Sequence, residues 1–192
     1  LLKMNKLPIY KISLDNSADG IAKMSLVEFP AVEQDFLAFT RQESIKFSIN
    51  EEKRIVFGPA IRADYPIYRI SPTIGEYFTV FTKDVIEELY QKFMIEQKFN
   101  CVNLEHNDDT NDIYLLQSFI KSSDTGLNPV GFEDCADGSW FVAYKVLNDE
   151  VWQGVKSGKF NGFSIEGWFS LDEVKENEEI DELEKIIDDI LQ

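Results

Sequence analysis

The chain has very few residues of the kinds that bind metals or form disulfides. Among its 192 residues are one histidine, His106, and two cysteines, Cys101 and Cys135. Structural zinc sites use four Cys or His ligands, and two cysteines do not make a disulfide framework. The sequence also has no P-loop, GxGxxG or HExxH motif. We therefore expect no metal and no cofactor, and we interpret both cysteines as reduced, small hydrophobic residues of a cytosolic protein.

Basic residues are scarce as well. Lys and Arg together number 19 and Asp and Glu 35, which gives a formal net charge of −16. A field of this sign repels phosphate, so nucleic acid and anionic membranes are not expected partners. No apolar run approaches the roughly 20 residues of a membrane span, and Pro8 and Lys11 interrupt the one stretch that resembles a signal peptide.

Apolar residues are plentiful, at 44% of the chain with 15 Phe, so a buried core is expected. The length predicts one domain with a small appendage. Apolar residues at helical spacing predict a helix after the N-cap residue Thr82 and another between Asn148 and Gly158, and Gly58-Pro59 predicts a bend or bulge inside a strand. Alternating patterns predict strands at 8–14, 21–27, 44–49, 54–61, 76–81, 102–106, 113–121, 140–147 and 160–170.

This order of elements lacks regular βαβ alternation. It favours an α+β fold with a mostly antiparallel, β-barrel-like core flanked by helices. The tail, 176–192, predicts a further helix in which Ile180, Leu183, Ile187 and Ile190 lie among acidic residues. Two interpretations of this helix stay open, because its apolar stripe can dock on its own domain or can serve interaction and oligomerisation.

Two polar segments separate predicted strands. Residues 122–138 are rich in Gly, Pro, Asp and Ser and predict a long, mobile loop, which we expect to border the substrate cleft. Residues 107–112 carry three Asp and two Asn, but Asp112 stands where an EF-hand loop needs Gly, so a solvated turn is the expected structure.

Two residues stand out as candidates for catalysis. An unperturbed imidazole titrates near neutrality, so His106 is suited to accept a proton from a hydroxyl. Strand alternation predicts that its side chain continues the buried stripe of Val102 and Leu104. Ser164 lies in Gly162-Phe163-Ser164-Ile165-Glu166-Gly167, where the bracketing glycines permit close backbone approach. This segment is not a nucleophile elbow, because Glu166 stands where that motif has Gly.

The order of these segments resembles that of the prohead (capsid maturation) serine proteases of tailed phages, in particular the XkdF-like branch. The resemblance covers about residues 8–170 and rests on Leu104-Glu105-His106-Asn107, the short helix ending at Gly158, and the segment around Ser164. Such proteases are similar in fold to herpesvirus assemblins. The resemblance implies an assemblin-like domain over 1–172, followed by an acidic amphipathic helix over 173–192, which we then expect to be an assembly element.

The resemblance also implies an activity and partners. Ser164 falls on the family's nucleophile and His106 on its general base. The chain would cleave precursors of the scaffold protein and the major capsid protein, process itself, form homo-oligomers and act in the host cytoplasm inside the assembling prohead. It would be encoded by a phage or by a prophage in a bacterium.

The third catalytic residue does not follow cleanly from the resemblance. The segment Met24-Ser25-Leu26-Val27-Glu28-Phe29-Pro30-Ala31 resembles a strand that in many prohead proteases follows the catalytic serine and carries the acid. Here it precedes His106, as a circular permutation would produce, and Lys23 or Ser25 stands in place of the acid. Glu28 and Glu166 are the candidate substitutes. The alternatives to an active protease are an inactive capsid-assembly protein on the same fold and an unrelated acidic β-rich binding module.

Overall fold

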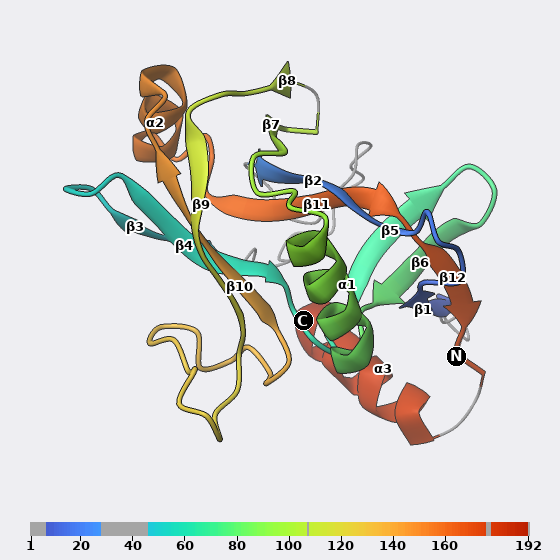
Figure 1. Ribbon diagram of the computed structural model, residues 1–192. Helices are drawn as coiled ribbons and strands as arrows, with labels where there is room; N and C mark the ends of the chain where they lie inside the picture. The colour runs from blue at the N-terminus through green and yellow to red at the C-terminus, as the bar shows by residue number, and fades with distance from the viewer. Residues whose placement is uncertain (1–6, 28–45, 107, 176–177, 192) are drawn as a thin grey trace.

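Three open sheets organise the part of the chain that the structure describes (Figure 1). In this computed structural model two strand pairs are parallel and the others antiparallel, so the predicted α+β class and mostly antiparallel pairing are confirmed. The described strands do not close into a barrel, so that prediction is wrong. The assemblin-like fold and the circular permutation stay predictions. The described residues are 7–27, 46–106, 108–175 and 178–191.

The first sheet, in the order β12-β1-β6-β5, lies against the C-terminal helix. Residues from β1 and β6 form a small apolar cluster with Leu183 and Ile187 of that helix, both of which are buried. The turn after β1 is held by Asp19, whose carboxylate accepts hydrogen bonds from neighbouring backbone N–H groups and from Ser170. The strands are β1 (Ile9–Ser13), β5 (Ile67–Ser71), β6 (Gly75–Val80) and β12 (Ser170–Glu173).

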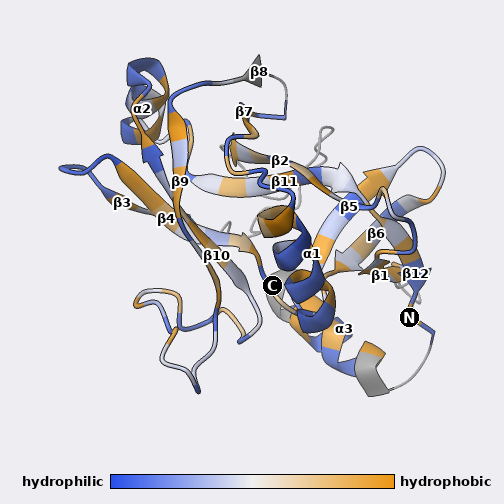
Figure 2. Cartoon of the chain, viewed as in Figure 1, coloured by the Kyte–Doolittle hydropathy of each residue, from blue (hydrophilic) through white to orange (hydrophobic). Residues whose placement is uncertain are grey.

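The second sheet, in the order β3-β4-β10-β9, carries the most apolar strands (Figure 2). Opposite Trp140 and Phe141 of β10, the pairing with β4 skips one residue between Pro59 and Ile61, which confirms the predicted bulge near Gly58-Pro59. The strands are β3 (Ser48–Asn50), β4 (Ile55–Ile61), β9 (Ile113–Ile120) and β10 (Trp140–Val146).

The loop 122–138, which joins β9 to β10, is packed onto the outer face of this second sheet. Phe132 and Cys135 of the loop are buried against an aromatic cluster on that face, and the buried ammonium of Lys121 donates hydrogen bonds to both of their carbonyl oxygens. β9 and β10 pair with each other and not with the strand that leads to His106, and Figure 1 shows the loop at the opposite end of the molecule from β7. The prediction that this loop borders the site of His106 is therefore wrong, while its mobility stays a prediction.

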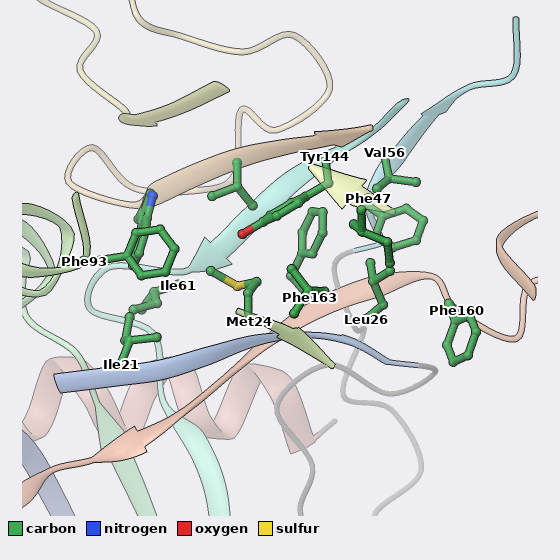
Figure 3. Packing of buried hydrophobic residues seen from close by; sticks show 14 of the residues in the cluster. Ile21, Met24, Leu26, Phe47, Val56, Ile61, Phe93, Tyr144, Phe160 and Phe163 are labelled. Atoms are coloured by element: carbon green, nitrogen blue, oxygen red, sulfur yellow. The ribbon is translucent and has the colours of Figure 1, made fainter. Parts of the chain in front are cut away.

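The third sheet, in the order β11-β2-β7-β8, packs its inner face against the second sheet. Side chains from both sheets fill the space between them, among them Met24, Leu26 and Phe163 from one side and Val56 and Tyr144 from the other (Figure 3). This large apolar cluster is the main core. The strands are β2 (Gly20–Val27), β7 (Val102–Leu104), β8 (Asp108–Asp109) and β11 (Gly162–Trp168).

Three helices complete the described fold. The predicted caps are confirmed, because Thr82 Oγ1 accepts a hydrogen bond from Val85 N and Asn148 Oδ1 accepts one from Val151 N. None of the described helices is long and apolar enough to cross a membrane. The helices are α1 (Lys83–Ile95), α2 (Asp149–Lys156) and α3 (Glu178–Leu191).

The two cysteines differ in their surroundings. Cys135 is buried as predicted, and burial raises the pKa of its thiol, so it remains protonated and inert. Cys101 is exposed, so the interpretation of both cysteines as buried hydrophobic residues holds for one of them only. The reason is position, since Cys101 stands just before β7 and not within it.

Candidate active site

A row of three polar side chains crosses the outer face of the third sheet. β11 pairs with β2 in the antiparallel direction so that Ser164 lies opposite Ser25, and β2 pairs with β7 in the parallel direction so that Ser25 lies opposite Asn103. Residues opposite one another in register project from the same face of a sheet. The neighbours of these residues, such as Met24 and Phe163, point to the other face and belong to the core.

His106 covers this row from a turn that immediately follows β7. The strand ends at Leu104, and both Glu105 and His106 have left-handed backbone conformations, with φ of 50° and 58°. This region is uncommon for residues other than Gly, so surrounding contacts must hold the turn. One such contact is the hydrogen bond that the Glu105 N–H donates to the carbonyl oxygen of Leu26, at 3.1 Å.

The turn corrects the predicted direction of the His106 side chain. Strand alternation placed it on the face of Val102 and Leu104, but the chain leaves the strand before His106 and reverses the side-chain direction. The ring consequently lies over the polar face, within hydrogen-bonding distance of the two serines there.

The imidazole of His106 lies between Ser164 and Ser25. Its Nε2 is 3.1 Å from Ser164 Oγ, and its Nδ1 is 3.0 Å from Ser25 Oγ. The structure thus brings the two predicted catalytic residues together from positions 58 residues apart in the sequence. A hydroxyl hydrogen-bonded to a ring nitrogen is the arrangement in which an imidazole can take the proton of a serine nucleophile.

The candidate third residues have different outcomes. Glu166 lies two residues after Ser164 on the same face of β11, and its Oε2 is 3.7 Å from His106 Nδ1. That distance is too long for a hydrogen bond but short enough for electrostatic stabilisation of a protonated ring. Glu28 lies outside the described residues.

A local irregularity in β11 follows Glu166. The pairing with β2 shifts between Glu166 and Gly167, as in a β-bulge. A Cβ atom at Gly167 would lie 2.1 Å from the carbonyl oxygen of Gly20, so only glycine fits there. This confirms the predicted close backbone approach at Gly167.

Ser25 and Asn103 link the His106 ring to Glu166 through hydrogen bonds. Ser25 Oγ donates a hydrogen bond to Asn103 Oδ1 at 2.5 Å, and Asn103 Nδ2 donates one to Glu166 Oε2 at 2.8 Å. Ser25 and Asn103 are 0% and 1% exposed, and Ser164 is 6% exposed. Sequence reasoning placed no catalytic role on Asn103. Its signal was a small polar residue between apolar Val102 and Leu104 in a strand that is otherwise buried.

No group of three or more His, Cys, Asp or Glu side chains within the described ranges is placed to hold a metal ion. The acidic segment 107–112 is only partly covered by this statement, because residue 107 and the side chains of 108 and 109 lie outside what the structure describes. Within the described ranges the hydrogen-bonded cluster at Ser164 is the candidate for chemistry.

Comparison with known proteins agrees with this chemistry. The profile of a family described as "Putative phage serine protease XkdF" matches residues 47–173, about two-thirds of the chain. The chain belongs to this family. A curated relative, "Phage-like element PBSX protein XkdF" of Bacillus subtilis (strain 168), is 24% identical over 140 residues, which cover 73% of this chain and 44% of the relative. The chain thus spans less than half the length of that relative. No solved structure matches the chain significantly.

Membership in this family excludes the unrelated acidic binding module as an interpretation of the chain. The matched region contains His106, Asn103, Ser164 and Glu166, whereas Ser25 on β2 lies before it. The match also ends at residue 173, at the end of β12, so α3 lies beyond it.

Proposed function

We propose that the chain is a serine endopeptidase of the phage prohead, which cleaves precursors of the scaffold and major capsid proteins, with Ser164 as nucleophile and His106 as general base. One observation carries this proposal: in a member of a phage serine protease family, the lone histidine lies 3.1 Å through Nε2 from the hydroxyl of a buried strand serine. The choice of precursors as substrates rests on the resemblance to prohead proteases.

The geometry supports acyl transfer in two steps. His106 Nε2 accepts the Ser164 proton as Oγ attacks the peptide carbonyl carbon, and the ring then donates that proton to the leaving amine. A water molecule then takes the amine's place and attacks the acyl carbon while Nε2 accepts one of its protons. The ring donates that proton to Ser164 Oγ as the bond from Oγ to the acyl carbon breaks, which releases the acid and restores the hydroxyl and the neutral ring. Only a neutral ring, with a free lone pair on Nε2, can begin either step.

Glu166 is the acidic member that this proposal favours. Its carboxylate lies 3.7 Å from Nδ1, where it stabilises the imidazolium that forms during attack. An acid missing at Lys23 or Ser25 would favour the alternative, an inactive capsid-assembly protein. The carboxylate of Glu166 on β11 supports the active protease instead.

Covalent labelling tests the proposal on the full chain. A fluorophosphonate probe should form an adduct on Ser164, identified by peptide mass mapping, and Ser164→Ala should abolish it. Ser118→Ala is a matched control, because Ser118 is also a strand serine with a hydrogen-bonded Oγ but lies on β9. Absence of an adduct on folded wild-type chain, or an adduct on another serine, would contradict the proposal.

Substrate cleavage tests the finer part. Co-expression with scaffold and major capsid precursors should yield truncated products that are lost in Ser164→Ala. Labelling of Ser164 without cleavage of either precursor would retain the serine hydrolase and contradict the proposed substrates.

A further inference from the structure

The network behind His106 determines which ring nitrogen carries the proton. Glu166 presents a carboxylate, which only accepts hydrogen bonds, so the amide of Asn103 must turn its NH₂ group toward Glu166. The carbonyl Oδ1 of Asn103 then faces Ser25 and accepts the single hydroxyl proton of that serine. Ser25 Oγ therefore has only lone pairs to offer His106.

This proton count fixes the tautomer of the neutral ring. The Nδ1 atom is 3.0 Å from Ser25 Oγ, and a hydrogen bond there requires that Nδ1–H be the donor. A neutral imidazole has one N–H, so Nε2 is left with a lone pair directed at Ser164 Oγ, 3.1 Å away. This is the tautomer that a general base needs.

Of the two groups near Nδ1, Ser25 Oγ lies within hydrogen-bonding distance and Glu166 does not. Glu166 Oε2 is 3.7 Å from Nδ1, beyond hydrogen-bonding distance, while the Ser25 and Asn103 side chains are almost fully buried. Hydrogen bonds in such a low-dielectric environment are stronger than at a surface, and an unpaired member would be costly. The carboxylate thus orients the ring through two neutral side chains.

We propose that Ser25 and Asn103 are positioning residues, which hold His106 in its Nδ1–H tautomer and connect it to Glu166. The role rests on the proposed function, since it prepares Nε2 to accept the Ser164 proton. It assigns to a neutral hydroxyl and amide the orienting task that a single carboxylate performs in Ser-His-Asp triads.

The tautomer can be read directly, because the chain contains one histidine. Long-range ¹H–¹⁵N correlation spectra of the ¹⁵N-labelled full chain, recorded at a pH where the ring is neutral, distinguish Nδ1–H from Nε2–H by the two nitrogen shifts. The wild-type ring should be predominantly Nδ1–H. In Ser25→Ala the Nδ1 atom loses its acceptor, and in Asn103→Leu the Ser25 proton is free to turn toward Nδ1. Both variants should shift the population toward Nε2–H.

Two further variants separate this effect from general disruption. Ser139→Ala is the matched control, because Ser139 is also 0% exposed and its Oγ accepts a hydrogen bond from Ala63 N. It should leave the tautomer unchanged. Glu166→Gln should also keep Nδ1–H, because the Gln carbonyl can accept from Asn103 and preserve the direction of every hydrogen bond.

Activity gives the second measurement. Ser25→Ala should lower kcat on the order of 10²-fold with little change in KM, since an unsuitable tautomer in a studied triad costs up to ~10⁴-fold. A wild-type ring that is mainly Nε2–H would overturn the proposal. An unchanged Nδ1–H population in Ser25→Ala would overturn it as well. If Ser25→Ala does not fold, Asn103→Leu supplies the same test. An Nδ1–H ring whose population shifts as expected, in a chain whose Ser164 is never labelled, would support the positioning role and overturn the proposed function instead.

Discussion

The second and third sheets share one core but cover their outer faces in opposite ways. On the second sheet Phe57, Phe119 and Phe141 stack across three strands, and Phe132 of the loop 122–138 closes over them. On the third sheet Ser164, Ser25 and Asn103 form a polar row, and His106 closes over it. The aromatic cover is held by the burial of apolar area. The His106 ring is held over the polar row by directional hydrogen bonds.

The proposed active site coincides with the polar cover. Polar residues that are buried on a sheet face must find partners, and here those partners form a chain from Ser164 to Glu166. Aromatic residues can cover a sheet face without needing hydrogen-bond partners for their side chains, as on the second sheet.

The largest expected effect comes from the polar cover. Ser164→Ala and His106→Ala should each lower the cleavage rate by a factor on the order of 10⁴ or more, and the double variant should be little slower than either single variant. The reason is that the imidazole has no nucleophile to activate once Ser164 is removed. Cleavage kinetics of a scaffold precursor would measure this. Rate losses that multiply in the double variant would show that the two residues act independently.

The aromatic cover should respond in stability alone. Phe141 is fully buried, so Phe141→Ala should lower the free energy of unfolding by about 4 kcal/mol, through lost burial and the cavity that remains. Labelling of Ser164 per folded molecule should stay at the wild-type rate. Urea unfolding and probe labelling at low denaturant would measure the two quantities. A large loss of labelling in folded protein would mean that the two covers are coupled.

The sequence predicted much of this arrangement because its patterns are local. Alternation at 140–147 and the caps Thr82 and Asn148 report on contacts within a few residues, and they gave the right elements. Strand β5 was missed, and its short apolar run contains Arg69 and follows Pro66. Sheet closure was wrong because pairing among distant strands leaves no trace in a local pattern.

Of the hydrogen-bonded cluster, the sequence singled out His106, Ser164 and Glu166 as candidates and missed Asn103. The roles of His106 and Ser164 came from a family resemblance, while the hydrogen bonds of Ser25 and Asn103 became visible only once β11, β2 and β7 were placed side by side. The predicted direction of the His106 side chain was wrong for a physical reason. Two consecutive left-handed residues, Glu105 and His106, end the strand, and neither is the Gly or Asn that usually signals such a backbone.

The C-terminal helix offers a smaller test. Leu183 and Ile187 are buried against Ile9 and Phe78, so the helix docks on its own domain and its stripe at these positions is not the exposed patch that motivated an assembly role. The assembly role itself stays a prediction. Leu183→Ala should lower the free energy of unfolding by about 3 kcal/mol. Thermal or urea unfolding would measure this. An unchanged stability, together with weakened self-association, would return the helix to the assembly interpretation.

The smallest expected effect concerns Asp19, a buried residue whose carboxylate lies outside the proposed active site. Burial raises the pKa of Asp19, but hydrogen bonds from Asn16, Ser170 and Asp15 outweigh it and lower the pKa below its usual value. A lowered folded-state pKa adds stability above the unfolded value of about 3.9, and this stability is lost as the pH falls through the folded value. Asp19→Asn should therefore be less stable than wild type near neutrality, with a difference that shrinks under acid.

Unfolding midpoints in urea across a pH series would measure that difference, with Ser164 labelling recorded in parallel at neutral pH. We expect labelling to be unchanged, because Asp19 holds the turn between β1 and β2 through backbone N–H groups and makes its cross-chain hydrogen bond to Ser170. If the difference in stability between wild type and Asp19→Asn grew as the pH falls, the pKa of Asp19 would be raised in the folded state and not lowered. A loss of labelling would show that the position of β2, and with it Ser25, depends on that turn.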